Sequence, residues 1–406
     1  MNVGIRHDDL RRRNRAMVLA AVRRAVRPSR TEIATVTGLS HSTISAITSD
    51  LIAEGVLMEN RMPDGSAAKR GRPQVAVTLN PHAASIVAVV LSMNSLSANL
   101  IDYAGASVAQ ERRHIPTLEL TREQLVAEAA AIVGRMIDAA TARPLRIVFA
   151  IQGITDAAER KLLWSPIVQH LDVEFSDLLE RAFGVDVAIE NDCNMIAEGL
   201  RWRDPQRYGR DFIAVLLSHG IGMGMMFRGQ LFSGTRSSAG EFGHMVHRPN
   251  GALCRCGRRG CIEAYAGNYA IWRNAHGVPD SRMTDTDISD ADMSKLAERA
   301  RSGDAAAREA FRIAGEAIGF GLGSLFALID PAPVAFVGQG AHAFDLMERP
   351  IRDAIAATAG GQHADSIVFD TLPDEAPIIL EGCAMRALAV VDQRISAGAP
   401  IERLPA

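Results

Sequence analysis

One histidine and three cysteines have the residue types and the spacing of a metal site. The pattern H-x9-C-x-C-x4-C is formed by His244, Cys254, Cys256 and Cys261. Four soft or borderline ligands suit tetrahedral Zn²⁺, and four protein ligands leave no open coordination position. Because three of the five cysteines fall within eight positions, a disulfide scaffold is a poor explanation. The sequence therefore predicts a structural zinc ion, with His247 open as a competing ligand.

Two stretches of this chain resemble motifs of the ROK family (repressor, open reading frame, kinase), which comprises bacterial sugar kinases and repressors of sugar-utilisation genes. One stretch runs from Glu241 through the cysteines to Glu263, and the other, residues 189–194, is similar to the family's E-N-D-x-N strand end. The resemblance covers about residues 80–395. It implies an α/β fold of the actin-like, ribonuclease H-like type, in which two lobes enclose a cleft as in sugar kinases.

The resemblance also implies a set of sugar-binding residues. Carboxylates and amides offer paired acceptors and donors to neighbouring hydroxyls, and buried polar groups that need those hydroxyls reject ligands without them. His244 would bind zinc through one ring nitrogen and the sugar through the other. The expected sugar contacts are the backbone near Gly153 and the side chains of Asn191, Asp192, Glu241, His244 and Glu263.

The loop that would hold ATP departs from the family pattern. The family's D-x-G-G-T loop should fall in residues 88–96, which read A-V-V-L-S-M-N-S-L. Val90 stands in place of the aspartate, and Ser92, Met93 and Asn94 replace Gly-Gly-Thr. Without these groups the backbone cannot approach a phosphate closely and Mg²⁺ loses a ligand. We therefore expect no kinase activity, so that Asp192, which matches the kinases' general base, would be vestigial.

Other departures leave the identity of the sugar open. Residues 152–156 lack the family's proline before the glycine, and the stretch through Trp164 and His170 lacks its expected asparagine. Two glycine patterns remain, at residues 220–224 and 338–340, but isolated glycines are weak evidence of phosphate binding.

Ahead of this region, three helices are expected. The first, Arg12–Val26, has an apolar stripe with arginines on the other face. Ser29 and Glu32 have capping-box spacing for a short second helix, and Ser40 can cap a third helix that runs to about Glu54. This is a helix-turn-helix arrangement, with an ordinary helical bundle as the alternative. The residues expected to read DNA are Ser40, His41, Ser42, Thr43 and Ser45.

Two extended runs, Val56–Asn60 and Gln74–Leu79, look like the wing of a winged helix. The limb between them carries Lys69, Arg70 and Arg72, which we expect to enter a narrow minor groove and to neutralise phosphates. An unstructured basic linker is the alternative. An α+β winged helix-turn-helix domain is therefore predicted before the α/β fold.

The distribution of charge agrees with a DNA-binding N-terminus. Residues 1–74 hold 13 Lys and Arg against 7 Asp and Glu, a net charge of +6, whereas the remainder holds 31 against 40, a net charge of −9. The N-terminus is charged, and no 18-residue apolar stretch lacks a charged or polar break. We expect a cytoplasmic protein without a membrane span.

The predicted organisation is a DNA-binding domain at 1–80, a first lobe at 81–195 with about 380–395, and a second lobe with the zinc site at 196–379. The predicted function is a sugar-responsive repressor of carbohydrate-utilisation genes, which as a homodimer or homotetramer binds an inverted-repeat operator. One alternative is a sugar kinase that retains a DNA-binding domain, and ATP-dependent turnover abolished by Asp192→Asn would favour it. The other is a zinc or thiol sensor, which would release DNA reversibly on metal removal without sugar.

Overall fold

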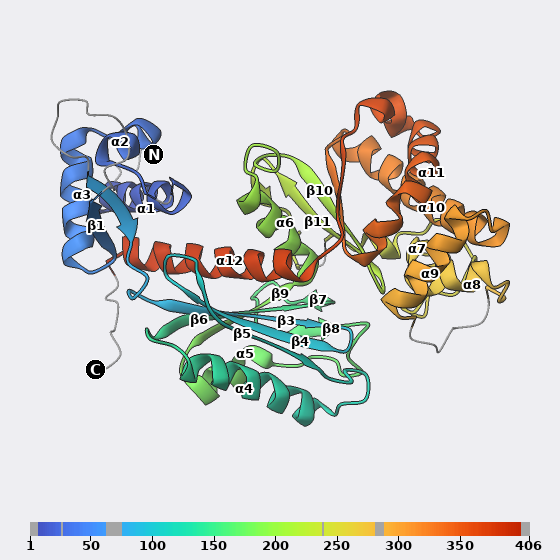
Figure 1. Cartoon of the computed structure of the whole chain (residues 1–406), viewed down its shortest axis with the longest axis horizontal. Coiled ribbons are helices and arrows are strands. Elements are labelled where there is room, and N and C mark those ends of the chain that lie inside the picture. The colour runs from blue at the N-terminus through green and yellow to red at the C-terminus, as the bar shows by residue number, and fades with distance from the viewer. Residues whose placement is uncertain (1–6, 26, 62–74, 238, 281–287, 399–406) are drawn as a thin grey trace.

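The structure, a computed structural model, describes residues 7–25, 27–61, 75–237, 239–280 and 288–398. Figure 1 shows three parts: a small head at one end, an α/β lobe beside it, and a second α/β lobe at the far end. A long helix near the C-terminus runs from the lobes to the head.

The head, residues 7–79, has the three helices and the two-stranded hairpin that the sequence predicts. Ser29 and Glu32 form the capping box: Ser29 Oγ accepts from the Glu32 amide at 3.2 Å, and the Glu32 carboxylate accepts from the Ser29 amide at 2.7 Å. Gly38, with φ 71°, ends the second helix. The predicted wing residues Lys69, Arg70 and Arg72 lie outside the described residues. The elements are α1 (His7–Ala25), α2 (Arg30–Thr37), α3 (His41–Ala53), β1 (Leu57–Arg61) and β2 (Val75–Leu79).

The first lobe is built on a five-stranded sheet with strand order β5-β4-β3-β6-β9. Because side chains alternate along a strand, Val90 and Ala150 face the C-terminal helix, whereas Val89 and Phe149 face the opposite layer of helices. The elements are β3 (Ser85–Ser92), β4 (Ser95–Asp102), β5 (Ser107–His114), β6 (Pro144–Ile151) and β9 (Asp186–Asn191), the hairpin β7 (Ile154–Thr155) and β8 (Leu162–Trp164), and α4 (Arg122–Asp138), α5 (Phe175–Phe183) and α12 (Ala376–Ser396).

The second lobe repeats this topology with the strand order β12-β11-β10-β13-β14. In each sheet, three antiparallel strands are extended by two parallel ones. Two such sheets are the actin-like, two-lobed fold that the sequence predicts. The strands are β10 (Phe212–Leu217), β11 (Ile221–Phe227), β12 (Gln230–Leu231), β13 (Val334–Val337) and β14 (Phe369–Leu372).

Helices cover the second sheet, and α6 lies between the lobes, in contact with both α12 and β11. Among the described residues, α10 alone has the length and apolar composition to cross a membrane, and half of its most apolar window is buried inside the fold. The helices are α6 (Asp192–Arg203), α7 (Glu263–Ala266), α8 (Asn268–Ala275), α9 (Asp290–Arg301), α10 (Ala305–Ile329) and α11 (Phe344–Ala356), with the 3-10 turns η1 (Phe242–His244), η2 (Gln339–Ala343) and η3 (Ala359–Ser366).

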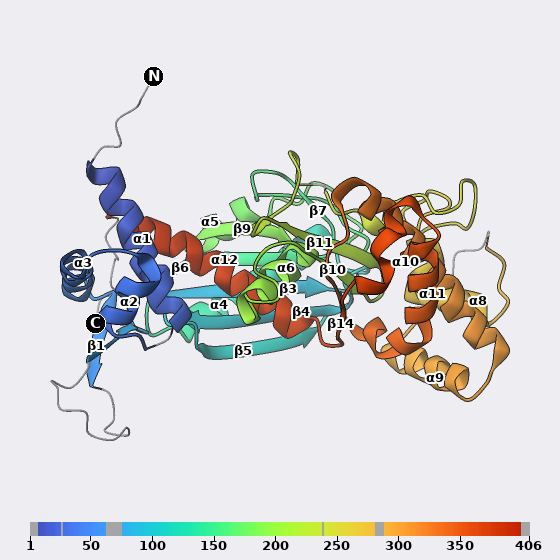
Figure 2. The same cartoon turned by 90° about the horizontal axis from the view of Figure 1, so that it is seen from above.

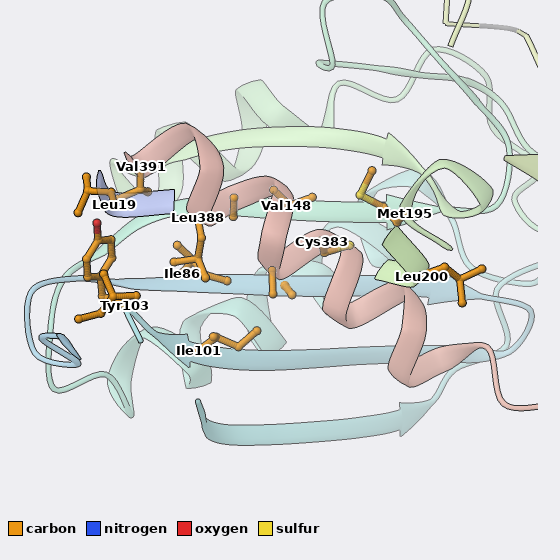
Figure 3. Close-up of a cluster of buried hydrophobic side chains, with 14 of the residues drawn as sticks. Leu19, Ile86, Ile101, Tyr103, Val148, Met195, Leu200, Cys383, Leu388 and Val391 are labelled. Atoms are coloured by element: carbon orange, nitrogen blue, oxygen red, sulfur yellow. The ribbon is translucent and has the colours of Figure 1, made fainter. Parts of the chain in front are cut away.

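One continuous apolar core joins the head to the first lobe. Figure 3 shows α12 lying across the sheet, with Cys383 near Met195 of α6 and Val391 near Leu19 of α1. Leu19 and Val391 are both fully buried. The head is therefore packed on α12 and is not tethered only by the chain.

Two arginines of α1 are buried, which the sequence analysis did not predict, because it placed the arginines opposite the apolar stripe. Arg23 donates to both carboxylate oxygens of Asp392 at 2.9 and 2.8 Å and to the Tyr103 carbonyl at 2.8 Å. Arg15 donates to Glu54 and, at 3.2 Å, to the Ile395 carbonyl. The two buried guanidinium groups therefore bind the head to Asp392 and the Ile395 carbonyl of α12.

Replacing Asp392 by alanine should destabilise the junction strongly, since Arg23 would keep a buried charge without its carboxylate. We expect the free energy of unfolding to fall by about 3–5 kcal/mol in urea denaturation. The apolar double variant Arg23→Met/Asp392→Leu should lose much less. The control is Asp353→Ala, which removes an exposed ion pair with Arg349. Equal urea midpoints for Asp392→Ala and Asp353→Ala would contradict this account of the junction.

Candidate functional site

A cleft that is open to solvent lies between the two lobes. All six residues predicted to contact a sugar line it, although they come from distant parts of the chain. The lining residues are Gln152, Gly153, Trp164, Pro166, Asn191, Asp192, Cys193, Leu216, Ile221, Gly222, Met223, Ala239, Gly240, Glu241, His244 and Glu263.

Asn191 and Asp192 stand where β9 ends and α6 begins. The Asn191 side chain caps α6, because its Oδ1 accepts from the backbone amide of Asn194 at 3.0 Å. The Nδ2 of the same side chain donates to the Gly153 carbonyl at 2.8 Å. Asp192 accepts from the Cys193 amide at 2.9 Å. Burial raises the pKa of Asp192 to about 7, so near neutral pH this carboxyl group can donate as well as accept a hydrogen bond.

Two glutamates enter the cleft from the second lobe. Glu241 precedes η1, and burial raises the pKa of its carboxyl group. Glu263, at the start of α7, is almost fully buried and accepts from the Ile221 amide at 3.3 Å and from the Tyr269 hydroxyl at 3.4 Å. The backbone and a tyrosine therefore fix the position of the Glu263 carboxylate.

The four predicted metal ligands lie together beside the cleft. The ligand atoms of His244, Cys254, Cys256 and Cys261 are all within 4.8 Å of one another. The Cys256 and Cys261 sulfurs are 3.7 Å apart, and Cys254 Sγ lies 3.8 Å from His244 Nδ1. A tetrahedral zinc site with Zn–S bonds of about 2.3 Å has edges of about 3.8 Å, so this donor set fits zinc. Several neighbouring thiolates also need a cation to offset their charge.

His247, the competing ligand, is not part of this group. Its ring packs edge-on against Tyr265 with the ring centroids 5.1 Å apart. The structure thus favours His244 over His247 as the nitrogen donor.

His244 joins the cysteine cluster to the cleft. Its Nδ1 faces Cys254, whereas its Nε2 lies 3.9 Å from Glu241 Oε2, on the cleft side. The Trp164 ring stands edge-on to the imidazole at 5.8 Å between centroids. One ring nitrogen of His244 therefore faces the cysteine cluster, and the other faces the cleft.

The predicted DNA-reading residues lie at the start of α3. Figures 1 and 2 both show α3 on the side of the head away from the lobes. Ser40 Oγ accepts from the Thr43 amide at 3.2 Å and so caps the helix, and Thr43 is half-buried. His41, Ser42 and Ser45 are exposed. Ser40 is exposed as well, and its Oγ lies 2.9 Å from the Ser42 hydroxyl, so four of the five side chains are at the surface and two of them are hydrogen-bonded to each other.

The cleft is also lined by Gln152, Trp164 and Met223, which were not predicted from the sequence. Trp164 reaches it because β8 folds back on β7, where Ile154 pairs with Trp164. Two- and three-residue strands carry no periodicity that a sequence could reveal.

Solved structures resemble this fold closely. The crystal structure of a ROK family transcriptional regulator, described as a homologue of the E. coli MLC protein, aligns with a TM-score of 0.77 at 20% identity and covers 96% of this chain and 99% of its own. A ROK family glucokinase from Streptomyces griseus, in complex with glucose and AMPPNP, aligns with a TM-score of 0.61 at 23% identity and covers 74% of this chain and 98% of its own. The second alignment covers a smaller share of this chain.

Similar sequences include repressors. A xylose repressor of Caldicellulosiruptor bescii is 24% identical, covering 86% of this chain and 88% of that protein. The DNA-binding transcriptional dual regulator NagC of Escherichia coli K12 is 26% identical, covering 82% of this chain and 81% of that protein. The ROK family profile matches residues 87–378, which is most of the chain, and the protein therefore belongs to the ROK family.

Proposed function

We propose that this protein is a sugar-responsive transcriptional repressor that acts in the cytoplasm, with residues 1–80 as its DNA-binding domain. The observation that carries the proposal is a helix-turn-helix head packed through one continuous core onto the lobe that bears half of the cleft. The names of the relatives, a xylose repressor and NagC, support the same function.

DNA binding is assigned to the exposed start of α3. Its small polar side chains suit hydrogen bonding to base edges in the major groove. Ion pairs within the head, such as Arg11–Asp50 and Arg30–Glu59, neutralise part of its basic excess. We therefore assign much of the phosphate contact to the wing residues Lys69, Arg70 and Arg72. Two heads in a homodimer or homotetramer would match an inverted-repeat operator.

The sugar signal would reach the head through α6 and α12. A Cβ added at Gly382 of α12 would lie 1.9 Å from the Met195 carbonyl, and one at Gly199 of α6 would lie 2.3 Å from the Ile378 carbonyl. The two helices therefore pack backbone against backbone and must move together. Since α6 begins at Asp192 in the cleft, a change there is carried to α12 and on to Arg23.

The turn between β3 and β4 supports a function without phosphoryl transfer. Ser92 pairs with Ser95, so Met93 and Asn94 form a tight two-residue turn, with Asn94 at φ 53°. Val90, in place of the kinase aspartate, is buried in the core that faces α12. Such a turn offers neither glycine amides nor a carboxylate to a metal-bound phosphate.

The glycines that remain in the family's second loop have a packing role. A Cβ at Gly222 would lie 2.4 Å from Cys193 Sγ, and one at Gly224 would lie 2.1 Å from the Cys193 carbonyl. Glycine is therefore needed here to admit α6 against β11, whether or not a nucleotide binds.

Zinc, held by His244 and the three cysteines, is assigned a structural role. When bound, it would offset most of the charge of the three thiolates and would fix the loop that leads from His244 to Glu263. The zinc-sensor alternative has no separate observation in its favour, because four protein ligands close the site.

Replacing Ser42 and Ser45 by alanine should weaken operator binding without unfolding α3, since both hydroxyls are exposed and neither caps the helix. We expect the affinity for the specific duplex to fall about 2- to 10-fold for each single hydrogen bond to a base that is removed, as measured by fluorescence anisotropy. Ser324→Ala, an exposed serine on α10, is the control and should bind as the wild type does. Unchanged operator affinity in the double variant would remove α3 from the interface.

Replacing Cys256 by serine should remove the metal and loosen the cleft. We expect one zinc per chain in the wild type by elemental analysis and well below one in the variant, with a lower unfolding temperature and weaker sugar binding. Cys383→Ala, which removes a buried thiol of α12, should keep the ion. A metal-free wild-type protein, or reversible DNA release by a chelator alone, would contradict the structural role.

A further inference from the structure

A groove lies between the head and the first lobe, and none of its described lining residues belongs to the cleft between the lobes. Helices α1 and α6 both pack on α12, and the groove is formed where these three helices and α2 come together. Its volume is about 470 Å³, within the range of about 300–1,000 Å³ that is usual for sites of small molecules. Such sites are frequent at domain interfaces, so this groove is a candidate for a second ligand site.

Much of the groove is apolar, and its side chains suit an aromatic ring. Met17 of α1 and Val36 of α2 line it from the head, and Trp202 of α6 and Met385 of α12 line it from the other side. Val36 is 74% exposed although it is apolar. Methionine sulfur and an indole ring both make favourable contacts with aromatic groups. The lining therefore favours a flat aromatic body over a polyhydroxylated one.

The charged side chains of the groove leave an excess of positive charge, since three arginines and two carboxylates line it. Asp392 is already held by Arg23 at 2.8 Å. Glu198 lies 3.5 Å from Arg201, which is a long contact for an ion pair. Arg24 is exposed, and no residue in the described part of the chain forms an ion pair or a hydrogen bond with its side chain. The groove can therefore accept one further negative charge.

We propose that this groove is a second ligand site, which binds a small aromatic carboxylate. The carboxylate would be held by Arg24 and Arg201, and the ring would pack against Trp202 and Met385. A carboxylate is ionised at pH 7, and the planar guanidinium group matches its two oxygens. An uncharged sugar has neither the charge nor the flat apolar body, so the groove and the cleft select different ligands.

A ligand in the groove would contact the head and the lobe at the same time. Because Met17 and Arg24 belong to the head whereas Arg201 and Trp202 belong to α6, the complete site exists only while the head lies as the structure has it. By mass action the ligand would stabilise this position of the head and so change operator affinity. This consequence, unlike the site itself, rests on the proposed function.

The test is isothermal titration of the full-length protein with three probes: 1-naphthoate, the neutral 1-naphthalenemethanol, which has the same rings, and acetate, which has the charge alone. We expect 1-naphthoate to bind, and each of the other two to bind at least about threefold more weakly. Raising the ionic strength should narrow the gap between 1-naphthoate and the alcohol, because salt screens the attraction. Failure of 1-naphthoate to bind, or an alcohol that binds as tightly, would overturn the proposal.

Two variants place the probe in the groove. Arg24→Gln should lower the affinity for 1-naphthoate by about threefold and leave the alcohol unaffected, whereas Trp202→Leu should weaken both. Arg27→Gln and Trp272→Leu change the same residue types outside the groove and are the matched controls. If either variant has the same effect as its control, the probe binds elsewhere and the assignment is wrong.

Two further measurements decide what the groove does. Saturating 1-naphthoate should change operator affinity by at least about threefold, and an unchanged affinity would contradict stabilisation of the head. If the protein binds no operator under any condition, the proposed function fails while the titration still decides the site. If 1-naphthoate does not bind and Trp202→Leu dissociates an oligomer in sedimentation, the groove is an interface between copies of the chain and the ligand site is wrong.

Discussion

The packing of α12 against α6 constrains the rest of the molecule. The two helices touch through Gly382 and Gly199 without intervening side chains, so neither can slide or tilt alone. One end of this pair begins at the cleft, and the other end carries Asp392, which holds Arg23 of the head. Because the interior is closely packed, we propose that a small rearrangement at Asp192 is carried along these helices to the head.

The polar side of the cleft is formed mainly by carboxyl groups. Carboxyl groups are brought together at high desolvation cost, which raises the pKa of Asp192 and of Glu241. Such a site gains most from a ligand that donates several hydrogen bonds, and it loses when those donors are missing. The cysteine cluster lies directly behind His244, where a bound ion would fix the imidazole in the orientation the cleft requires.

Local chemistry made much of this structure predictable. The capping box of Ser29 and Glu32, the cap at Ser40 and the cysteine spacing each depend on a few neighbouring residues, and the structure has them as expected. The family resemblance supplied the six cleft residues. Trp164 could not be foreseen, because a three-residue strand leaves no pattern. The burial of Arg23 depends on Asp392, 369 positions away, and no local signal marks such a pair.

The central claim is that sugar in the cleft and operator on the head are energetically coupled through α12. The most direct test measures operator affinity with and without saturating sugar, and sugar affinity with and without saturating operator, on one preparation of full-length protein. The account predicts that both affinities change by the same factor, at least about fivefold, because binding free energies around a cycle are reciprocal. A sugar that binds the cleft and leaves operator affinity unchanged would contradict it.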